Sequence, residues 1–282
     1  MIIVKLWGGI GNQLFQYVFG QYVRYRYQQV VVYDDNSYIS TDKLRKRELD
    51  GLNVDISYDN HCAFSKYAGM KGRLMRYLYQ LNPWHTFVGL SEKIPENFDA
   101  KKEYYLQAYW QDVKYYDWLK TNYNFDLKIK EFPRQLSELK SEILANANSV
   151  SIHVRRGDYF KPQFVNLYGL CTEKYYEQAI SMIIKEIQDA HFYLFSDDLE
   201  WSKSHIDLKE NVTYIPNYDI CQFAYIELMS LCHHHIISNS SFSWWGAVLN
   251  ERSDSIVISP NKWLRGSDTT LALDKWKKII VS

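Results

Sequence analysis

Short apolar runs alternate along the chain with longer segments in which apolar residues recur every three to four positions. The short runs predict buried strands, and the longer periodic segments predict helices. The chain opens with both: residues 2–6 (IIVKL) predict a strand, 7–13 (WGGIGNQ) a glycine-rich turn and 14–28 an amphipathic helix. A second strand is predicted at 30–35 (VVVYDD). A strand, a helix and a second strand in this order are typical of an α/β domain.

The middle of the chain has a weaker pattern. Residues 62–81 form a basic segment with helical spacing, which 82–87 (NPWHTF) interrupt. Residues 104–119 predict a strand that leads into an aromatic helix, and 132–149 predict a helix that ends in a polar turn.

A second α/β series follows, with a domain boundary predicted near residue 148. We therefore expect an acceptor-side domain over 1–148 and a nucleotide-binding domain over 149–282. Each strand of the second series ends in polar residues, at the sheet edge where open parallel sheets bind ligands. Its predicted strands are 149–154, 191–198, 235–239 and 255–260, and its predicted helices are 172–188 with Thr172 as N-cap, 223–234, 240–251 and 270–280.

Composition and charge limit the possible functions. The chain has 282 residues, 46% of them hydrophobic and 23% charged, which is typical of a globular protein. Lys and Arg number 33, as do Asp and Glu, so no overall positive field draws the protein to nucleic acid. Any anion site must be local. Aromatic residues make up 16%, which indicates either sugar stacking or an aromatic-rich core.

The cysteines and apolar segments bear on the compartment. The four cysteines are scattered without a C-x-x-C pair, which favours reduced thiols in the cytoplasm. The N-terminus lacks the pattern of a signal peptide. The longest stretch without Asp, Glu, Lys or Arg, residues 228–250, contains three His, two Asn and five Ser and is too polar for a membrane span. We expect no transmembrane segment, and peripheral association with the inner face of a bacterial membrane is compatible with this pattern.

The segment 151–160 (SIHVRRGDYF) carries the first candidate site. His153 and Arg155 share one face of the predicted strand, and Arg156 and Asp158 lie at the turn that follows. Two adjacent guanidinium groups suit a phosphate or a diphosphate, because each presents a planar fork of donors. Asp158 is a candidate to orient an arginine or to accept a proton. The alternative is a structural Arg–Asp pair at the edge of the sheet.

The glycine-rich turn at 8–13 is the second candidate. Gly9 and Gly11 match the first two glycines of a dinucleotide fingerprint, but the third falls on Leu14, and Asn12 and Gln13 are bulky for that turn. Nicotinamide binding is therefore disfavoured. The turn either presents its backbone and the following helix N-terminus to a ligand or serves only as a tight turn.

Two further strand ends carry polar groups. Ser196, Asp197 and Asp198 close a strand with two carboxylates, which match the N1–H and N2–H₂ edge of guanine; they could instead bind a metal or cap the next helix.

The fourth candidate is a strand-to-helix turn rich in hydroxyl groups. It can donate N–H and O–H groups to a phosphate, or it can be an ordinary helix cap by Ser240 or Ser241. The polar residues of this turn are Asn239, Ser240, Ser241 and Ser243.

No metal site is predicted. His233, His234 and His235 are contiguous, so they face opposite sides of a strand and are interpreted as separately hydrogen-bonded residues. The arginine pair, the carboxylate pair and the hydroxyl-rich helix start instead outline a nucleoside diphosphate, with arginines in place of a divalent cation.

Six blocks in order resemble the α-1,2-fucosyltransferases, the bacterial relatives of the blood-group H enzymes. They are GGIGNQLFQY, YLQAYWQ, HVRRGDY, FSDDLEW, NSSFSWWGAVLN and VISPNKW, between residues 8 and 263. The resemblance implies a GT-B-like fold of two facing Rossmann-like domains with the active site in the cleft. It implies inverting, metal-independent transfer of fucose from GDP-β-L-fucose to the 2-hydroxyl of a terminal β-galactoside of a cell-surface glycan, free or lipid-linked, without a cofactor. Ala108 stands where the family usually has glycine.

The same resemblance implies roles for the candidate residues. His153 and Asp198, with Asp197, would hold guanine, and Arg155 and Arg156 would hold the diphosphate and stabilise the leaving group. Asn239 and the serines from Ser240 to Ser243 would contact phosphate or ribose, and Gly9, Gly11, Asn12 and Gln13 would line the cleft.

Two other classes remain open from the residues alone: a non-catalytic carbohydrate-binding protein, and a transferase that uses another sugar nucleotide.

Overall fold

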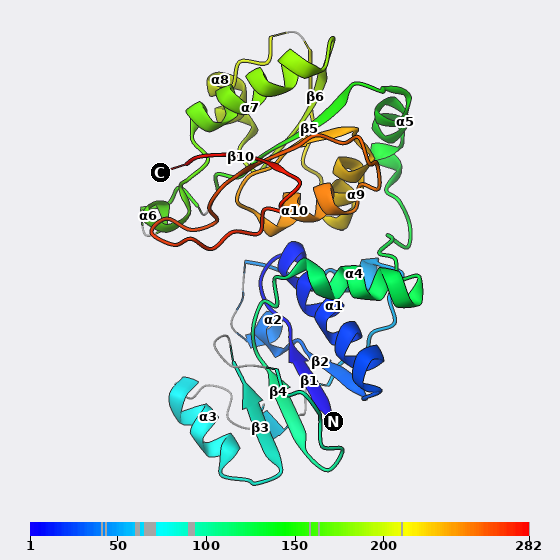
Figure 1. Cartoon of the computed structure of the whole chain (residues 1–282), viewed down its shortest axis with the longest axis vertical. Helices are drawn as coiled ribbons and strands as arrows, with labels where there is room; N and C mark the ends of the chain where they lie inside the picture. The colour runs from blue at the N-terminus through cyan, green and yellow to red at the C-terminus, as the bar shows by residue number, and fades with distance from the viewer. Residues whose placement is uncertain are drawn as a thin grey trace. The chain divides into compact units, whose positions relative to one another are not determined.

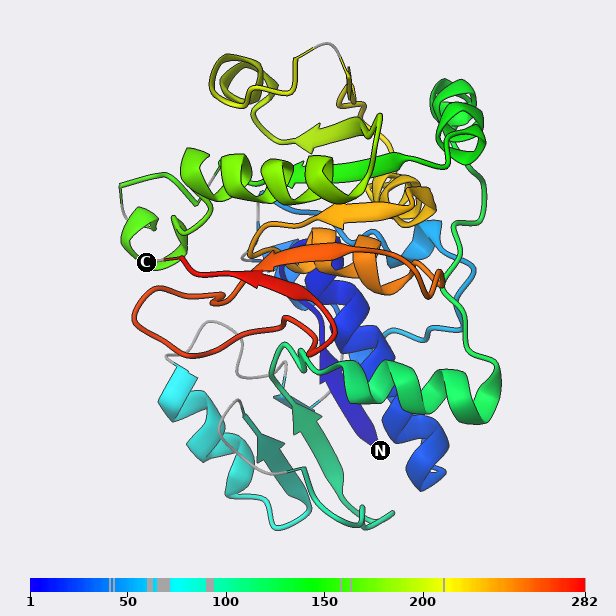
Figure 2. The same ribbon diagram turned by 45° about the horizontal axis from the view of Figure 1, so that its top comes forward.

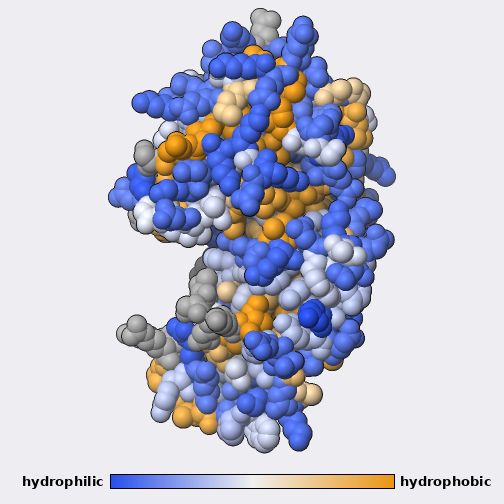
Figure 3. All heavy atoms as spheres, viewed as in Figure 1, coloured by the Kyte–Doolittle hydropathy of each residue, from blue (hydrophilic) through white to orange (hydrophobic). Residues whose placement is uncertain are grey.

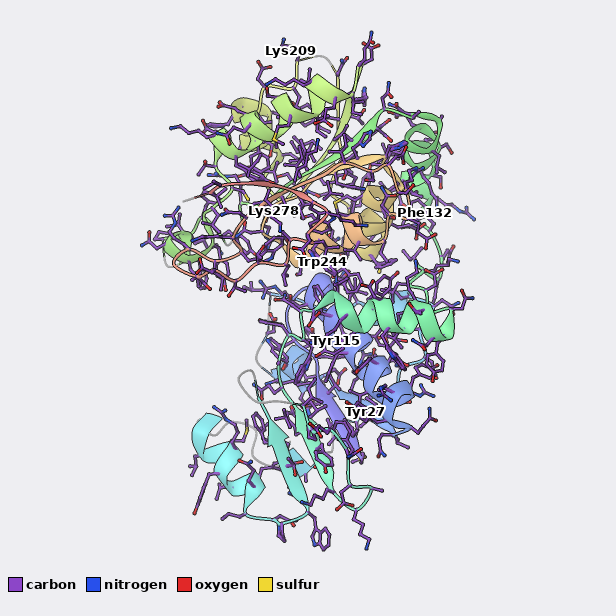
Figure 4. The ribbon with its side chains drawn as sticks, in the orientation of Figure 1. Tyr27, Tyr115, Phe132, Lys209, Trp244 and Lys278 are labelled. Atoms are coloured by element: carbon purple, nitrogen blue, oxygen red, sulfur yellow. The ribbon has the colours of Figure 1, made fainter. Side chains whose placement is uncertain are left out.

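A computed structural model describes residues 1–40, 42, 44–59, 63–64, 72–89, 94–157, 159–162, 164–209 and 211–281. Its contacts divide the chain into two compact units, Met1–Lys130 and Glu131–Ser282 (Figure 1). The division falls before the boundary expected near residue 148, so the helix α5 (Ser137–Ala145) belongs to the second unit. There Lys140 of α5 forms an ion pair of 2.6 Å with Glu227 of α9 (Phe223–Leu231) and lies over the ring of Phe132, which Figure 4 labels.

The first unit is built on an all-parallel sheet in the order β2-β1-β4-β3. Its aromatic content is used largely in the core: Tyr115, labelled in Figure 4, packs edge-on against Phe19 with 5.1 Å between ring centroids. The elements are β1 (Ile2–Lys5), α1 (Ile10–Tyr27), β2 (Val31–Asp34), α2 (Asn36–Ser40), η1 (Leu49–Gly51), α3 (Gly72–Gln80), β3 (His85–Val88), β4 (Glu103–Leu106) and α4 (Val113–Tyr123).

The second unit has a six-stranded parallel sheet in the order β10-β9-β8-β5-β6-β7 (Figure 2). All six residues of the central strand β5 are buried, because helices cover both faces of a parallel sheet. In addition to α5 and α9, its elements are η3 (Arg134–Leu136), β5 (Ser149–Val154), α6 (Val165–Tyr168), α7 (Glu173–Glu186), β6 (His191–Ser196), α8 (Leu199–His205), β7 (Val212–Tyr214), β8 (His234–Ile236), α10 (Ser241–Val248), β9 (Val257–Pro260) and β10 (Lys277–Ile279).

The strand order of the second unit fixes where a ligand is expected. From β5 the chain builds β6 and β7 on one side, and it then returns to add β8, β9 and β10 on the other. The direction of winding therefore reverses between β5 and β8. In open α/β sheets the crevice beyond the carboxyl ends of two such strands is the usual ligand site.

The helix predicted for residues 270–280 is wrong, because this segment ends in the strand β10, paired in parallel with β9. Leu273, Trp276 and Ile279 recur every three residues, which suggested a helix. Ile279 and Val281 are buried, whereas Ile280 between them is 85% exposed, which is the alternation of a strand. The edge of β9 supplies the backbone hydrogen-bond partners. Of the helices that the structure describes, none has the length and apolar character that a membrane crossing requires.

Candidate functional site

Arg155 and Arg156 lie directly after β5, at the carboxyl edge of the second sheet, and Asp197 lies directly after the neighbouring β6. The Arg155 Nη1 atom is 2.9 Å from Asp197 Oδ2, and the backbone N–H of Arg156 donates to Asp197 Oδ1 at 2.8 Å. A single carboxylate thus holds one arginine by its side chain and the other by its backbone. A structural Arg–Asp pair is therefore present, and its acid is Asp197.

Gly157 allows this close approach. A Cβ atom on Gly157 would lie 2.4 Å from Asp197 Oδ2, well inside van der Waals contact. The glycine of the RRG turn is thus required by the carboxylate that packs on it. Asp158, the predicted base or arginine-orienting residue, lies outside the described residues.

The Arg156 guanidinium is stacked between two rings. Its Cζ atom lies 3.9 Å from the ring centroid of Phe160 and 3.7 Å from that of Trp201. Its Nε atom is buried and has no hydrogen-bond partner among the described residues. Burial lowers the pKa of Arg156, against the attraction of Asp198. With two rings this close to Cζ, we expect an anion to approach in the plane of the guanidinium, where the fork of N–H donors points.

His153, the last but one residue of β5, lies at the point where the winding of the sheet reverses. Its Nδ1 atom is 2.9 Å from the hydroxyl oxygen of Ser238, which follows β8, and its ring packs against Phe242. Burial, with a smaller effect of Arg155, lowers the pKa of His153 to about 3, so the imidazole is neutral at physiological pH. Since Nδ1 is engaged, a ligand would be contacted through Nε2.

Asp198 caps the helix α8. Its Oδ1 atom accepts from the backbone N–H of Trp201 at 3.1 Å, and its own N–H donates to the Ser196 hydroxyl at 2.9 Å. Ser196 also accepts from the Ser202 hydroxyl at 3.1 Å. Of the two acids that the sequence offered as helix caps, Asp198 is therefore the one that caps a helix. The cap places Trp201 in the first turn of α8, where it covers one face of Arg156.

The Asn239 amide is engaged within the protein. Its Nδ2 atom donates to the carbonyl oxygens of Tyr168 and Trp263, both at 3.0 Å, and its Oδ1 atom is 3.5 Å from Cys171 Sγ. Asn239 thus links its own segment to residues 168–171 and to Trp263 near the sheet edge. Its side chain is buried and makes these structural contacts.

The serines at the start of α10 divide into two kinds. Ser240 is the N-cap, and its hydroxyl accepts from the N–H of Phe242 at 3.3 Å. Ser243 is fully buried, with its hydroxyl 3.4 Å from the Ser240 carbonyl oxygen. Ser241 is partly exposed at the first helical position. Of the three predicted phosphate-binding serines, Ser241 is the one best placed to meet a ligand. The adjacent Trp244 and Trp245 are buried.

The glycine-rich turn of the first unit is held by amides. The buried Gln13 donates from Nε2 to the carbonyl oxygens of Gly8 and Lys46, both at 3.0 Å, and accepts on Oε1 from the N–H of Glu48 at 2.9 Å. Asn12 accepts on Oδ1 from Gln111 at 2.9 Å. These two predicted cleft residues therefore bind loops of their own unit.

Gly9 and Gly11 stand at the start of α1. Gly9 is its N-cap and partly exposed, and Gly11 is buried in its first turn. The turn residue that needs a glycine conformation is Gly8, whose φ is +84°.

An aromatic pair lies beside this turn. Trp7 and Tyr109 follow β1 and β4, the two adjacent central strands of the first sheet, and their ring centroids are 4.7 Å apart at 34°. Both rings are partly exposed. Two hydrogen bonds fix the loops: the Trp7 N–H donates to Gln16 Oε1 at 3.1 Å, and Gln111 donates to Asn12.

The three contiguous histidines have separate partners, as predicted. His233 Nε2 is 2.9 Å from Asp254, and His234 Nδ1 accepts from the N–H of Ile256 at 3.0 Å. His235, fully buried, lies between Ser151 and Asn250 at 2.8 and 2.7 Å. Within the described ranges, no group of three or more His, Cys, Asp or Glu residues is placed to hold a metal ion.

Comparison with known proteins decides the family. The model of glycosyl transferase family 11 matches residues 66–278. The chain belongs to glycosyl transferase family 11, the α-1,2-fucosyltransferase family. It is 30% identical to the O-antigen biosynthesis glycosyltransferase WbnK of Escherichia coli, over 95% of this chain and 97% of that protein. It is 29% identical to an alpha-1,2-colitosyltransferase of the same species, over 99% of each chain.

The fold agrees with this family assignment. The structure of the NodZ alpha-1,6-fucosyltransferase soaked with GDP-fucose, a protein from Bradyrhizobium, superimposes with a TM-score of 0.59 at 14% identity, over 94% of this chain and 96% of that one. The chain therefore has a GT-B-like α/β fold, as the sequence resemblance implied.

Several side chains of this family 11 glycosyltransferase were not predicted as parts of the site. Phe160 is the last residue of the segment SIHVRRGDYF and Trp201 the last of the block FSDDLEW, but nothing in the sequence showed that their rings lie against Arg156. Ser238 was assigned only to a strand. Trp7 and Tyr109 carried one available signal, since each is an aromatic residue at the end of a predicted strand.

Proposed function

We propose that this glycosyltransferase is a galactoside 2-α-L-fucosyltransferase. It moves L-fucose from GDP-β-L-fucose to the 2-hydroxyl of a terminal β-galactoside of a cell-surface glycan, with inversion and without a metal ion. The observation that carries the proposal is the stacked Arg156, whose buried Nε lacks a partner among the described residues at the carboxyl edge of the sheet. Such a group suits the in-plane contacts of a diphosphate.

The reaction breaks the bond between C1 of fucose and an oxygen of the β-phosphate. Negative charge grows on the departing GDP, and Arg155 and Arg156 stabilise that charge more in the transition state than before it. The acceptor 2-oxygen forms its bond to C1 from the opposite face and loses its proton to a base. Asp158 is our candidate for that base or for a second orienting partner of Arg155. The two guanidinium groups take the role that a divalent cation has elsewhere.

The neighbouring groups take supporting parts in this proposal. His153 contacts guanine through Nε2, and Asp198 accepts from the guanine edge with the oxygen that does not cap α8. Asp197 is a positioning residue, because both of its oxygens already hold the arginine turn. Ser241 contacts a phosphate at the start of α10.

The acceptor is bound, in this proposal, by the aromatic pair of the first unit. Pyranose rings stack their C–H faces on aromatic side chains, and Trp7 and Tyr109 offer two such rings on fixed loops. The acceptor is a galactose-terminated oligosaccharide or a lipid-linked glycan, used in the cytoplasm or at the inner face of a bacterial membrane.

A second candidate donor follows from one comparison. The full-length likeness to an alpha-1,2-colitosyltransferase favours GDP-colitose, whose sugar is L-fucose without the 3-hydroxyl. Incubation with equal amounts of GDP-fucose and GDP-colitose, with a panel of β-galactosides and linkage analysis by NMR, decides between them. We expect α-1,2-linked fucose as the main product. Preferential transfer of colitose would replace the proposed donor.

Calorimetry separates a transferase from a carbohydrate-binding protein. We expect GDP to bind in the presence of EDTA, with an affinity that added Mn²⁺ does not raise, and UDP to bind more weakly. Binding of galactosides without any binding of GDP would contradict the proposal.

A further inference from the structure

Large apolar side chains gather on the outer face of α3 and the turn that follows it. Leu74 is 51% exposed, Tyr77 62%, Leu81 60% and Trp84 53%. The N–H of Leu81 donates to the Tyr77 carbonyl at 3.1 Å, so the helical path continues through Leu81. Single exposed apolar residues are common on protein surfaces, but a cluster such as this marks a contact surface.

The opposite face of α3 is used for folding. Met75 and Tyr79 pack into a small core with Phe64 and Phe87, beside the edge strand β3 (Figure 1). At about 100° per residue, Leu74, Tyr77 and Leu81 fall within about 60° of one another, on the other side of the helix from this core. The helix therefore has two apolar faces: one packs against the core of the first unit, and the other is exposed.

The turn after α3 fixes Trp84 next to this face. The Asn82 side chain accepts from the N–H of Trp84 at 3.0 Å, and the Asn82 carbonyl accepts from the N–H of His85 at 3.0 Å. The His85 ring then stacks on Tyr79 with 4.4 Å between centroids. Trp84 is thus an exposed indole on a defined turn, and in Figure 3 hydrophobic residues come to the surface over α3.

The charge of this part of the chain has one sign. Residues 60–91 contain two Lys and two Arg and no Asp or Glu. One of these, Arg76, is exposed on α3, with its guanidinium 5.2 Å from the Phe87 ring centroid. Leucine with Trp and Tyr on one face, next to basic residues, is the composition of helices that lie in the interface of anionic membranes.

We propose that the α3 face, made of Leu74, Tyr77, Leu81 and Trp84, docks the protein on an anionic phospholipid surface. The apolar side chains enter the boundary between headgroups and acyl chains, and the net positive charge of residues 60–91 attracts the segment to the anionic headgroups. A folded-protein partner would be expected to match the basic residues with acids at defined positions, whereas a lipid surface needs only net negative charge. Docking on a phospholipid surface does not depend on which sugar the protein transfers.

Flotation with lipid vesicles tests the proposal. The full chain is mixed with vesicles of phosphatidylglycerol and phosphatidylethanolamine, or of phosphatidylcholine alone, without donor or acceptor. We expect binding to the anionic vesicles that weakens between 0.1 M and 1 M salt. The variant Leu74→Gln/Leu81→Gln/Trp84→Gln should lose at least about tenfold in partition, since each apolar side chain contributes roughly that factor when buried. A matched control, Leu144→Gln/Ile184→Gln/Ile280→Gln, changes three exposed apolar residues of the second unit and should bind as the unmodified chain does.

Three outcomes would overturn the inference: no binding to anionic vesicles, equal binding by the α3-face variant, or equal loss in the control. Dimers in sedimentation that the α3-face variant abolishes, without vesicle binding, would assign the face to a second copy instead. Circular dichroism and turnover of a soluble galactoside establish that the variant is folded. If no galactoside is turned over, the vesicle result still stands, so failure of the proposed reaction is distinguishable.

Discussion

The carboxyl edges of the two parallel sheets differ in chemistry. The edge of the second sheet is considered at β5 and β8, where the direction of winding reverses, and that of the first sheet at its two central strands, β1 and β4. At the second edge, Arg155 pairs with Asp197, and Arg156 beside it stacks on Trp201 and has an Nε donor without a partner among the described residues. At the first edge, Asn12 and Gln13 bond to loops of their own unit.

The difference indicates two kinds of ligand. A guanidinium pair with a stacked, desolvated member suits a charged group whose charge increases during reaction. A rigid turn that presents the Trp7 and Tyr109 rings suits a neutral sugar. The carboxyl edge of a parallel sheet can therefore serve a donor or an acceptor, and the side chains at that edge decide which.

The comparison fails if Arg156 has no special role, and its removal has the largest expected effect. We expect Arg156→Ala to lower kcat/KM by about 10²–10³, because a preorganised donor to the leaving group is lost. Arg156→Lys should recover little, since an ammonium group has neither the fork nor the plane that stacks between Phe160 and Trp201.

The matched control for Arg156 is Arg252→Ala, which removes an exposed arginine of the same unit whose Nη1 bonds to the Leu231 carbonyl. It should keep its activity. Full activity of Arg156→Ala in initial-rate assays with GDP-fucose would remove the basis of the proposed mechanism.

Gln13→Leu tests the other edge. The substitution removes the three hydrogen bonds that the Gln13 amide makes with the carbonyl oxygens of Gly8 and Lys46 and with the N–H of Glu48. We expect a loss of about 2–3 kcal/mol in the free energy of unfolding, measured in urea, with GDP affinity unchanged. Gln29→Leu is the control, because its Nε2 makes only a 3.4 Å contact to Tyr27. A large loss of ligand affinity without loss of stability would instead make Gln13 a binding residue.

The fold could be predicted largely from the sequence, because apolar runs and spacing report burial directly. The strands at 2–6, 30–35 and 149–154 are confirmed. The segment 270–280 was assigned to the wrong class, since spacing of three along a sheet-edge segment imitates a helix until its partner strand is known.

The site was predictable in its residue types and less so in their contacts. That Arg155 and the Asp197–Asp198 pair meet at one edge follows from parallel strands ending together. The division of labour between the two acids could not be predicted, since it depends on which carboxylate caps α8. The stacking of Arg156 on Trp201 could not be predicted either, because it depends on the direction in which α8 leaves the sheet.

Acid should weaken the second unit, which holds three buried histidines. Burial lowers the pKa of His153 and His235 to about 3 and that of His234 to about 4, against about 6.5 when unfolded. At a pH between the folded and the unfolded pKa values, these histidines bind protons in the unfolded chain but not in the folded chain. Stability is therefore complete above pH 6.5 and falls as the pH drops, by about 1.4 kcal/mol per pH unit for each histidine.

Urea unfolding at pH 7, 6 and 5 measures this loss. Because His153 remains neutral from pH 8 to 6, GDP affinity in this range should change only with the protonation of the terminal phosphate of GDP. Hydrogen exchange, corrected for intrinsic rates, should show more opening in Glu131–Ser282 than in Met1–Lys130 at pH 5. The same stability at pH 5 as at pH 7 would show that these histidines are not buried in the neutral form.

The smallest expected effect tests the acceptor side. Trp7→Ala or Tyr109→Ala should raise KM for the galactoside by about three- to tenfold, the equivalent of one lost stacking contact, while GDP affinity stays the same. Trp7→Phe should recover most of the loss because a ring remains. The control is Tyr123→Ala, which breaks the similar Tyr25–Tyr123 pair, 4.4 Å apart at 31°, away from the sheet edge. If Tyr123→Ala raises KM as much as Tyr109→Ala does, the effect is one of packing in the first unit, and the acceptor must be sought on other residues.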